Sequence, residues 1–194
     1  YDANVRFGVE IEVLGFAFDD PAYNSGINGW PVLCGTKEAY EKYKQDESVF
    51  FVYALYRSDI LKERIALRDS FPKERFLSFT HPTVYVAKSA QLGAGNIILA
   101  NCVINNNVVI GDFNTMNSNA LIGHDTKLGD NNFIAGHTCI GSNLCIGNGN
   151  FMGLNCCIRN FAKIGDYNLI GMAANVLKDV GSNSVLVGNP AKIK

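Results

Sequence analysis

His124 and Asp125 are adjacent residues whose side chains suit acid–base chemistry, and they stand in the stretch 117–130, NSNALIGHDTKLGD. A neutral imidazole near pH 7 is a good general base for an amine or hydroxyl nucleophile. A neighbouring carboxylate can orient the ring and stabilise its charged form. Adjacent residues of a flat strand point to opposite faces, so the pair requires a corner, which Ile122 and Gly123 favour. The alternative is a solvent-facing corner pair without a catalytic role.

A zinc site would need three ligands that converge on one point. The chain has three histidines, of which His81 lies far before His124 and His137. We therefore expect no metal. None of the six cysteines forms a C-x-x-C pair, and a scattered set is typical of reduced thiols in the cytoplasm. The alternatives are a disulfide or an unrecognised metal site. The cysteines are Cys34, Cys102, Cys139, Cys145, Cys156 and Cys157.

The composition describes a folded chain without strong charge. It has 194 residues, of which 47% are hydrophobic, so a sizeable core can be buried. The net charge of -1 and the pI of about 6.3 do not suggest nucleic acid or an anionic membrane as a partner. No apolar run approaches the roughly 18 residues of a membrane span, and no signal peptide is visible. The chain begins with Tyr1 rather than Met, so a preceding segment is expected.

A six-residue period runs through the second part of the chain. An α-helix of about 3.6 residues per turn cannot keep every sixth residue on one face. A hairpin sheet would interrupt the count with turn residues, so unbroken sixes are typical of a solenoid in which each short strand forms one side of a coil. The aliphatic residues that lead the hexads are Val86, Leu92, Ile98, Ile104, Ile110, Met116, Ile122, Leu128, Ile134, Ile140, Ile146, Met152, Ile158, Ile164, Ile170 and Val176.

A longer repeat in the sequence predicts the length of the coil. The phrases LGAGNI, IGDFNT, LGDNNF, IGNGNF and IGDYNL follow one another at intervals of eighteen residues, which is three hexads and therefore a three-sided coil. With coils about 4.8 Å apart, we expect the amides at the fifth position to form a structural ladder. The glycine at the second position is expected to supply backbone angles that a tight corner demands. The ladder residues are Asn96, Asn114, Asn132, Asn150 and Asn168.

The first 80 residues lack this period and have the composition of an α/β unit. The stretch VFFVYAL (49–55) is apolar throughout and predicts a buried strand. Alternating strands and helices favour a small parallel sheet. We therefore divide the chain into an α/β domain, 1–80, and a coiled domain, 81–194. The other expected strands are 10–20, 29–35 and 75–79, and the expected helices are 36–45 and 58–71, the latter with Ser58 as N-cap.

The hexads resemble the left-handed parallel β-helix of the hexapeptide-repeat acyltransferases. The resemblance implies homotrimers with active sites between neighbouring subunits. It is more specific for fold than for substrate, because the family also includes γ-class carbonic anhydrases and scaffolds without known chemistry. An α/β unit ahead of a β-helix is similar to the sugar acyltransferases of the PglD and NeuD type. Those enzymes acetylate amino sugars on nucleotide carriers, or sialic acid.

The motif of that type, N-x-x-x-x-x-x-H-[ED], is matched by Asn117, His124 and Asp125. The resemblance implies that His124 deprotonates the sugar amine, that Asp125 orients His124, and that Asn117 helps to position the nucleophile. The closing VGNPAKIK is similar to the family's G-x-P-A-K, which implies that Pro190 and Lys192 border the coenzyme A site.

Further coenzyme A contacts are implied for the later coils, at His137, Gly153, Leu154 and Gly171. Some relatives carry a coenzyme-facing histidine nine residues after the base, where this chain has Phe133. His137 lies one coil from Asn119 and from Asn155. It either takes over that contact or occupies a ladder position that tolerates histidine.

The resemblance also implies that the α/β domain binds the nucleotide-linked sugar. Asp19 and Asp20 match a double acid that could contact the base or ribose; the alternative is two solvated turn acids. The A-I-G-N stretch of relatives is replaced by residues 54–57, in which Tyr56 would narrow the nucleotide pocket or stack on a base, with Arg57 beside it. The Gly-rich turn that opens the domain in relatives is absent, so we expect a Rossmann-like domain that is truncated.

The sequence thus predicts a cytoplasmic acetyl-CoA-dependent N-acetyltransferase acting on a nucleotide-linked amino sugar. The amine would attack the thioester directly, without an acyl-enzyme, and a backbone N–H would stabilise the oxyanion. Three alternatives stay open. They are O-acetylation of a sialic-type sugar, a non-catalytic trimeric scaffold, and a zinc hydratase.

Overall fold

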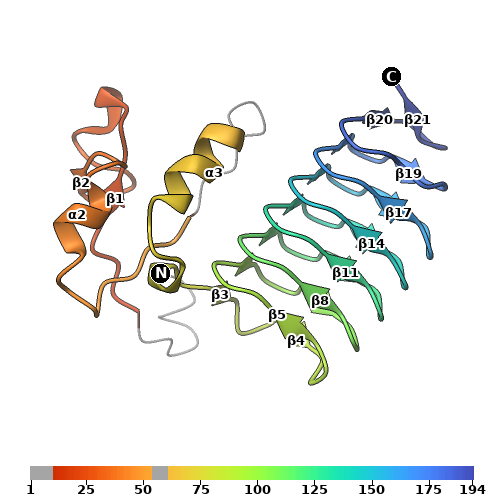
Figure 1. Ribbon diagram of the computed structural model, residues 1–194, viewed down its shortest axis with the longest axis horizontal. Coiled ribbons are helices and arrows are strands. Elements are labelled where there is room, and N and C mark those ends of the chain that lie inside the picture. Colours follow the sequence, from red (N-terminus) through yellow and green to blue (C-terminus); the bar gives the residue numbers. More distant parts are fainter. Residues whose placement is uncertain (1–10, 54–60) are drawn as a thin grey trace.

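A stack of three-sided coils forms most of the chain, and a small α/β unit lies to one side of it (Figure 1). The computed structural model describes residues 11–53 and 61–194. From β3 to β19, strands eighteen residues apart pair in parallel, so that Ile122 lies opposite Ile104 on one side and Ile140 on the other. The last coil is shorter, because Leu169 pairs with Val185, sixteen residues on. The predicted three-sided coil is therefore confirmed, and the stacked parallel strands fit a left-handed β-helix.

Three sheets form the sides of the coils. Sheet 1 consists of β3 (Phe79–Thr80), β6 (Ile97–Ile98), β9 (Thr115–Met116), β12 (Phe133–Ile134), β15 (Phe151–Met152), β18 (Leu169–Ile170), β20 (Val185–Val187) and β21 (Lys192–Ile193). Sheet 2 consists of β4 (Tyr85–Val86), β7 (Val103–Ile104), β10 (Leu121–Ile122), β13 (Cys139–Ile140), β16 (Cys157–Ile158) and β19 (Asn175–Val176). Sheet 3 consists of β5 (Gln91–Leu92), β8 (Val109–Ile110), β11 (Lys127–Leu128), β14 (Cys145–Ile146) and β17 (Lys163–Ile164). Only β21 among these strands runs antiparallel to its neighbour, β20.

The core of the stack is the column of leading aliphatic residues inside the coils. Ile104, Ile122, Ile134 and Ile140 are fully buried, as the six-residue period predicts. Each such side chain contributes about 1.5–3 kcal/mol on burial. The residue before each of them points outward, because side chains alternate along a strand. The outer faces of the three sheets are therefore lined by the sixth residue of each hexad.

Three corners join the sheets. Corner A joins sheet 1 to sheet 2 and comprises 81–84, 99–102, 117–120, 135–138, 153–156 and 171–174. Corner B joins sheet 2 to sheet 3 and comprises 87–90, 105–108, 123–126, 141–144, 159–162 and 177–179. Corner C joins sheet 3 to sheet 1 and comprises 93–96, 111–114, 129–132, 147–150, 165–168 and 181–184.

The tight turn at each corner falls on the fourth residue of the hexad, not on the second. Except at the ends of the stack, the fourth residue has a positive φ, as in Asn107 (58°) and Asn143 (61°). Asn, Asp and His are the non-glycine residues that most readily adopt this conformation. The prediction that the second-position glycines supply unusual backbone angles is wrong. A Cβ on Gly129 would lie 2.8 Å from the carbonyl oxygen of Gly147, so these glycines are required by the close approach of successive coils.

The asparagine ladder is confirmed at corner C. Asn132 donates its main-chain N–H to Asn114 Oδ1 at 2.8 Å and its side-chain amide to the same oxygen at 3.0 Å. Asn150 bonds to Asn132 in the same way, and Asn168 to Asn150. All of these side chains are buried. The ladder therefore satisfies buried polar groups and fixes the register of neighbouring coils.

The described part of the α/β unit is smaller than predicted. Its parallel sheet pairs β1 (Phe16–Ala17) with β2 (Val32–Cys34). Its helices are η1 (Pro21–Tyr23), α2 (Ala39–Tyr43), α3 (Leu61–Asp69) and η3 (Lys73–Arg75). The predicted helices therefore form over shorter spans, and of the segment 75–79 only Phe79 belongs to a strand. Ser58 lies outside the described residues.

The predicted buried strand 49–55 is wrong in the part that the structure describes, 49–53. Phe51 forms one isolated parallel bridge to Phe76, and its ring contacts those of Phe71 and Phe76. Phe50 and Val52 are 50% and 48% exposed. A two-stranded sheet cannot cover both faces of a further segment, so Phe51 and Tyr53 turn toward Phe76 while the residues between and before them are exposed.

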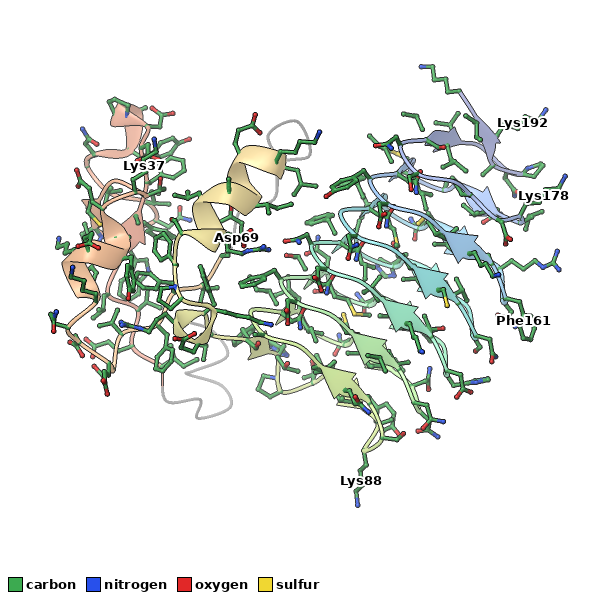
Figure 2. The ribbon with its side chains drawn as sticks, viewed as in Figure 1. Lys37, Asp69, Lys88, Phe161, Lys178 and Lys192 are labelled. Atoms are coloured by element: carbon green, nitrogen blue, oxygen red, sulfur yellow. The ribbon has the colours of Figure 1, made fainter. Side chains whose placement is uncertain are left out.

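Helix α3 joins the unit to the stack at corner C. The guanidinium of Arg68 lies over the ring of Phe113, 4.1 Å from its centroid, and donates to Asn131. Lys73 forms an ion pair with Asp112. Burial by itself would raise the pKa of Asp112, but the Lys73 hydrogen bond, the Ala94 N–H and the nearby cations outweigh it and hold that pKa below its usual value. Corner B lies on the side away from α3, where Figure 2 shows Lys88, Phe161 and Lys178 projecting.

Candidate functional site

His124 and Asp125 meet at corner B, directly after β10. The Nδ1 atom of His124 lies 2.7 Å from Oδ2 of Asp125. Their side chains are 57% and 45% exposed. Asp125 is the fourth residue of its hexad and has a φ of 57°, so the turn brings its carboxylate beside the ring that precedes it. The prediction that the pair requires a corner is confirmed.

The carboxylate of Asp125 is held at both oxygens. The side-chain amide of Asn107, one coil earlier, donates to Oδ1 at 3.0 Å, and Oδ2 faces His124. The Asn107 hydrogen bond and then the His124 contact lower the pKa of Asp125 below its usual value. Asp125 therefore stays ionised, and an ionised partner favours the tautomer with the proton on Nδ1 of His124. The Nε2 atom is then the acceptor that a substrate can reach.

The side chain of His124 does not form the hydrogen bond between coils that another residue at the same position of corner B forms. Asn160, two coils on at the same hexad position, accepts the main-chain N–H of Ser142 through Oδ1 at 2.9 Å. Such a bond ties one coil to the next. The ring of His124 instead pairs with its own neighbour, while its main-chain oxygen accepts the N–H of Asn143. The side chain of His124 is thus left to the surface.

The remaining β-helix residues expected in the site lie at corner A. Asn117 follows β9, so it stands at the other end of strand β10 from His124, and one chain does not bring the two side chains together. His137, Gly153, Leu154 and Gly171 follow on later coils of the same corner. Main-chain bonds link these coils, from His137 to Ser118, from Asn155 to Gly136 and from Ala173 to Leu154.

His137 occupies the turn position of its corner, with a φ of 59° between Asn119 (63°) and Asn155 (57°). The turn alone therefore accounts for a residue of this type. Phe133 lies on the outer face of sheet 1, where its ring stacks on that of Phe151 with centroids 5.2 Å apart. Phe133 thus faces a different direction from His124.

The acidic pair of the α/β unit has local partners. Asp19 accepts hydrogen bonds from the main chain of Thr36 at 2.8 Å and from its hydroxyl at 2.5 Å. Asp20 caps η1 by accepting the N–H of Ala22 at 2.9 Å. These contacts explain both acids structurally, and their contact with a nucleotide stays a prediction. Tyr56 and Arg57 lie outside the described residues.

Pro190 and Lys192 belong to the closing hairpin of the stack. Lys192 pairs with Val187 across β20 and β21, and Ala191 donates its N–H to the carbonyl oxygen of Asn175 at 2.8 Å. Pro190 and Lys192 are exposed. Figure 2 shows Lys192 at the end of the stack beyond Lys178.

Other features of the described residues lie away from the dyad. Over 11–53 and 61–194 no three His, Cys, Asp or Glu side chains are grouped to hold a metal, and no helix is long and apolar enough to cross a membrane. A cavity of about 230 Å³ lies between α3 and corner C and is not lined by His124. Within one chain, the dyad is therefore an open surface site.

The sequence reasoning missed Asn107 as a partner of the dyad. It stands eighteen residues before Asp125, so the coil length places the two residues in neighbouring coils, although it does not predict the hydrogen bond between their side chains.

The fold and the dyad define a hexapeptide-repeat β-helix chain with a histidine–carboxylate pair on one corner. Neither a protein-family model nor a curated protein sequence matches the chain. Solved structures do match in fold. A histidine variant of perosamine N-acetyltransferase from Caulobacter crescentus, in complex with CoA and GDP-perosamine, superposes with a TM-score of 0.81 at 23% identity, over 92% of this chain and 84% of that one.

Two further structures share this fold. WeeI from Acinetobacter baumannii has a TM-score of 0.80 at 23% identity, over 98% of this chain and 91% of its own. The acetyltransferase domain of PglB from Neisseria gonorrhoeae, in complex with acetyl coenzyme A, has a TM-score of 0.78 at 23% identity, over 92% and 85%. These likenesses establish that the chain has the fold of those proteins.

Proposed function

We propose that the chain is an acetyl-CoA-dependent N-acetyltransferase that acts on the amino group of a nucleotide-linked amino sugar, as surface glycan synthesis requires. The observation that carries this proposal is the 2.7 Å contact between His124 Nδ1 and Asp125 Oδ2 on an exposed corner. It leaves Nε2 of His124 as a base for an incoming nucleophile. The fold shared with proteins solved with coenzyme A and an amino sugar supports the choice of reaction.

The transfer would proceed by direct attack. The amine nitrogen forms a bond to the thioester carbonyl carbon, and Nε2 of His124 takes the proton that the nitrogen loses. The C–S bond then breaks, and the proton passes from the imidazolium to the coenzyme A thiolate. The pKa of Asp125 is held below its usual value, so the carboxylate stays ionised. It stabilises the imidazolium until that proton is passed on. The proposal needs no covalent acyl-enzyme, so it gives the cysteines no role.

A second copy of the chain would complete the site. The half-exposed dyad at corner B needs another surface to exclude water from the transferring acyl group. The coenzyme A contacts implied for the later coils, including His137 and Gly153, lie at corner A together with Asn117, the implied positioner of the nucleophile. We therefore place corner A of one copy against corner B of the next, in a homotrimer.

The chemistry of corner A suits the acyl and pantetheine part of acetyl-CoA. Gly153 and Gly171 carry no side chain, while Leu154 and Met172 beside them are 51% and 74% exposed. Small and apolar residues allow close approach of a thioester and cover its apolar groups. At the end of the stack, the exposed Lys192 offers a cation for the phosphates, beside Pro190.

The α/β unit would hold the nucleotide of the acceptor sugar. Its two strands are parallel, and ligands of α/β sheets bind where such strands end. Asp19 follows β1, and its hydrogen bonds to Thr36 place it beside the loop that follows β2. A Rossmann-like domain and its contacts to the base or ribose through Asp19, Asp20, Tyr56 and Arg57 belong to this proposal.

The test is a transfer assay read by mass spectrometry. Purified protein is incubated with acetyl-CoA and a panel of UDP-, dTDP- and GDP-linked amino sugars, and in parallel with hydroxyl analogues of the same sugars. Acetylation of an amino sugar is the expected result and names the acceptor. Acetylation of the hydroxyl analogues alone would replace this proposal by O-acetylation. Failure of both, with no binding of acetyl-CoA, would favour a scaffold, and stoichiometric zinc by elemental analysis would favour a hydratase.

A further inference from the structure

Asn107 stands directly before Asp125 in the stack of corner B. The two residues are eighteen positions apart, and both adopt the left-handed turn conformation, with φ of 58° and 57°. The side-chain amide of Asn107 donates to Oδ1 of Asp125 at 3.0 Å, while Oδ2 of Asp125 faces Nδ1 of His124 at 2.7 Å. The main chain of Asn107 is itself tied down, because its N–H donates to the hydroxyl of Ser89 at 3.0 Å.

We propose that Asn107 is a positioning residue of the transfer site, which fixes the plane of the Asp125 carboxylate and thereby the orientation and tautomer of the His124 ring. This inference rests on the function proposed above. A carboxylate bonded at one oxygen can rotate about its χ2 bond, whereas one held at both oxygens keeps a single plane. The ring that bonds to it then presents Nε2 in one direction only.

The type of residue at 107 does not by itself reveal this role. The turn position favours asparagine, and Asn101, Asn119 and Asn155 occupy it elsewhere in the stack. The distinguishing observation is the side-chain hydrogen bond to the next coil. It also contributes most to the lowered pKa of Asp125, because an amide donor stabilises the ionised carboxylate.

The two coils next to the dyad carry no charged residue at corner B. The preceding coil places Asn105 and Asn106 there beside Asn107, and the following coil places Ser142 and Asn143. The charged residue that follows on the same coil is Lys127 of β11, which points outward from sheet 3. An effect of residue 107 on Asp125 can therefore be separated from effects of other charges.

Asn143 provides a matched control. It flanks Asp125 from the other side, one coil on, in the same turn conformation with a φ of 61°. It is exposed, and no hydrogen bond joins its side chain to Asp125. Glycine fits this backbone conformation, so Asn107→Gly and Asn143→Gly each remove a side chain without straining the turn.

The experiment combines ¹³C NMR of the Asp125 carboxyl with steady-state kinetics on the full chain. The signal is assigned by its loss in Asp125→Asn. In Asn107→Gly, we expect the pKa of Asp125 to rise and kcat to fall about 10-fold, with KM for acetyl-CoA unchanged, as for the loss of one hydrogen bond to a charged group. In Asn143→Gly, we expect both quantities to stay at their original values.

A second variant tests the donor rather than the shape. Asn107→Asp is nearly isosteric but places a carboxylate against that of Asp125, so one of the two should titrate at higher pH and kcat should fall at least as far. Equal Asp125 pKa values in Asn107→Gly and Asn143→Gly, or equal rates in the two, would overturn the positioning role. If the original chain transfers no acetyl group while the NMR shift appears, the proposed function fails instead.

Discussion

Asn150 donates both its main-chain N–H and its side-chain amide to one oxygen of Asn132, at 2.9 and 3.0 Å, inside corner C. The oxygen is fully buried, so no water can replace it as an acceptor. This pair repeats along the corner and connects each coil to the next. The stability of the stack therefore depends on the amides as well as on the aliphatic core.

Asn132→Ala should destabilise the protein by about 1–3 kcal/mol, because it leaves the amide of Asn150 buried without an acceptor. Urea unfolding at fixed protein concentration measures the change. Asn101→Gly is the control, since Asn101 is an exposed turn residue. Equal unfolding midpoints for the two variants would contradict the ladder's contribution.

Gly129→Ala should also destabilise, by about 1–3 kcal/mol, because the added methyl meets the backbone of the next coil. Gly181 occupies the same corner position on the last coil, where a Cβ would meet nothing within 4 Å. Gly181→Ala is therefore expected to change stability by less than about 0.5 kcal/mol. If the two substitutions lower the stability equally, the close approach of successive coils is not the reason that glycine is required at these positions.

Asp125→Asn should lower kcat by about 10- to 100-fold if the dyad acts as proposed. Asparagine tolerates the φ of 57°, so the fold should be kept, but its amide would donate to Nδ1 and move the proton of His124 to Nε2. The partial exposure of the carboxylate keeps the loss below that of a buried pair. An unchanged kcat, with circular dichroism matching the original protein, would exclude Asp125 from the mechanism.

The reactivity of each thiol should depend on its burial. Burial raises the pKa of Cys156 to about 11, whereas Cys145 is exposed on sheet 3. At pH 8, iodoacetamide should therefore label Cys145 and spare Cys156 until urea is added, as peptide mapping would show. Labelling of Cys156 in the folded protein at the rate of Cys145 would contradict its burial.

The same shift predicts a loss of stability at high pH. The folded chain keeps the Cys156 proton up to about pH 11, whereas the unfolded chain releases it from its ordinary value of 9.0. The unfolded state then binds fewer protons, so stability falls as pH rises through that window. Cys156→Ala should flatten this part of the curve of urea midpoint against pH. An equally steep fall in the variant would assign the loss to other groups.

The sequence determined the stack closely and the α/β unit poorly, for a physical reason. The same type of buried residue recurs at a fixed spacing, as at Ile104, Ile122 and Ile140, so one period predicts the core, the coil length and the register together. The α/β unit has no repeat, and its strands are as short as Phe16–Ala17. An apolar segment such as 49–53 then has too little sheet to pack on.

The candidate site could likewise be predicted only in part. The need for a corner at His124 and Asp125 follows from the alternation of side chains along a strand, and it was predicted. The bond from Asn107 spans eighteen residues and depends on side-chain direction, which the pattern does not supply. The separation of Asn117 from His124 by strand β10 also requires the coil to be seen.

The role of His124 as the base can be tested by removing its imidazole. The rate of acetyl transfer to the best acceptor is followed by mass spectrometry across pH for the original chain, His124→Ala, and Ser142→Ala, the control at the same hexad position one coil on. We predict a fall of about 10²- to 10⁴-fold in His124→Ala and no change in Ser142→Ala. A His124→Ala rate equal to that of the original chain would contradict the account.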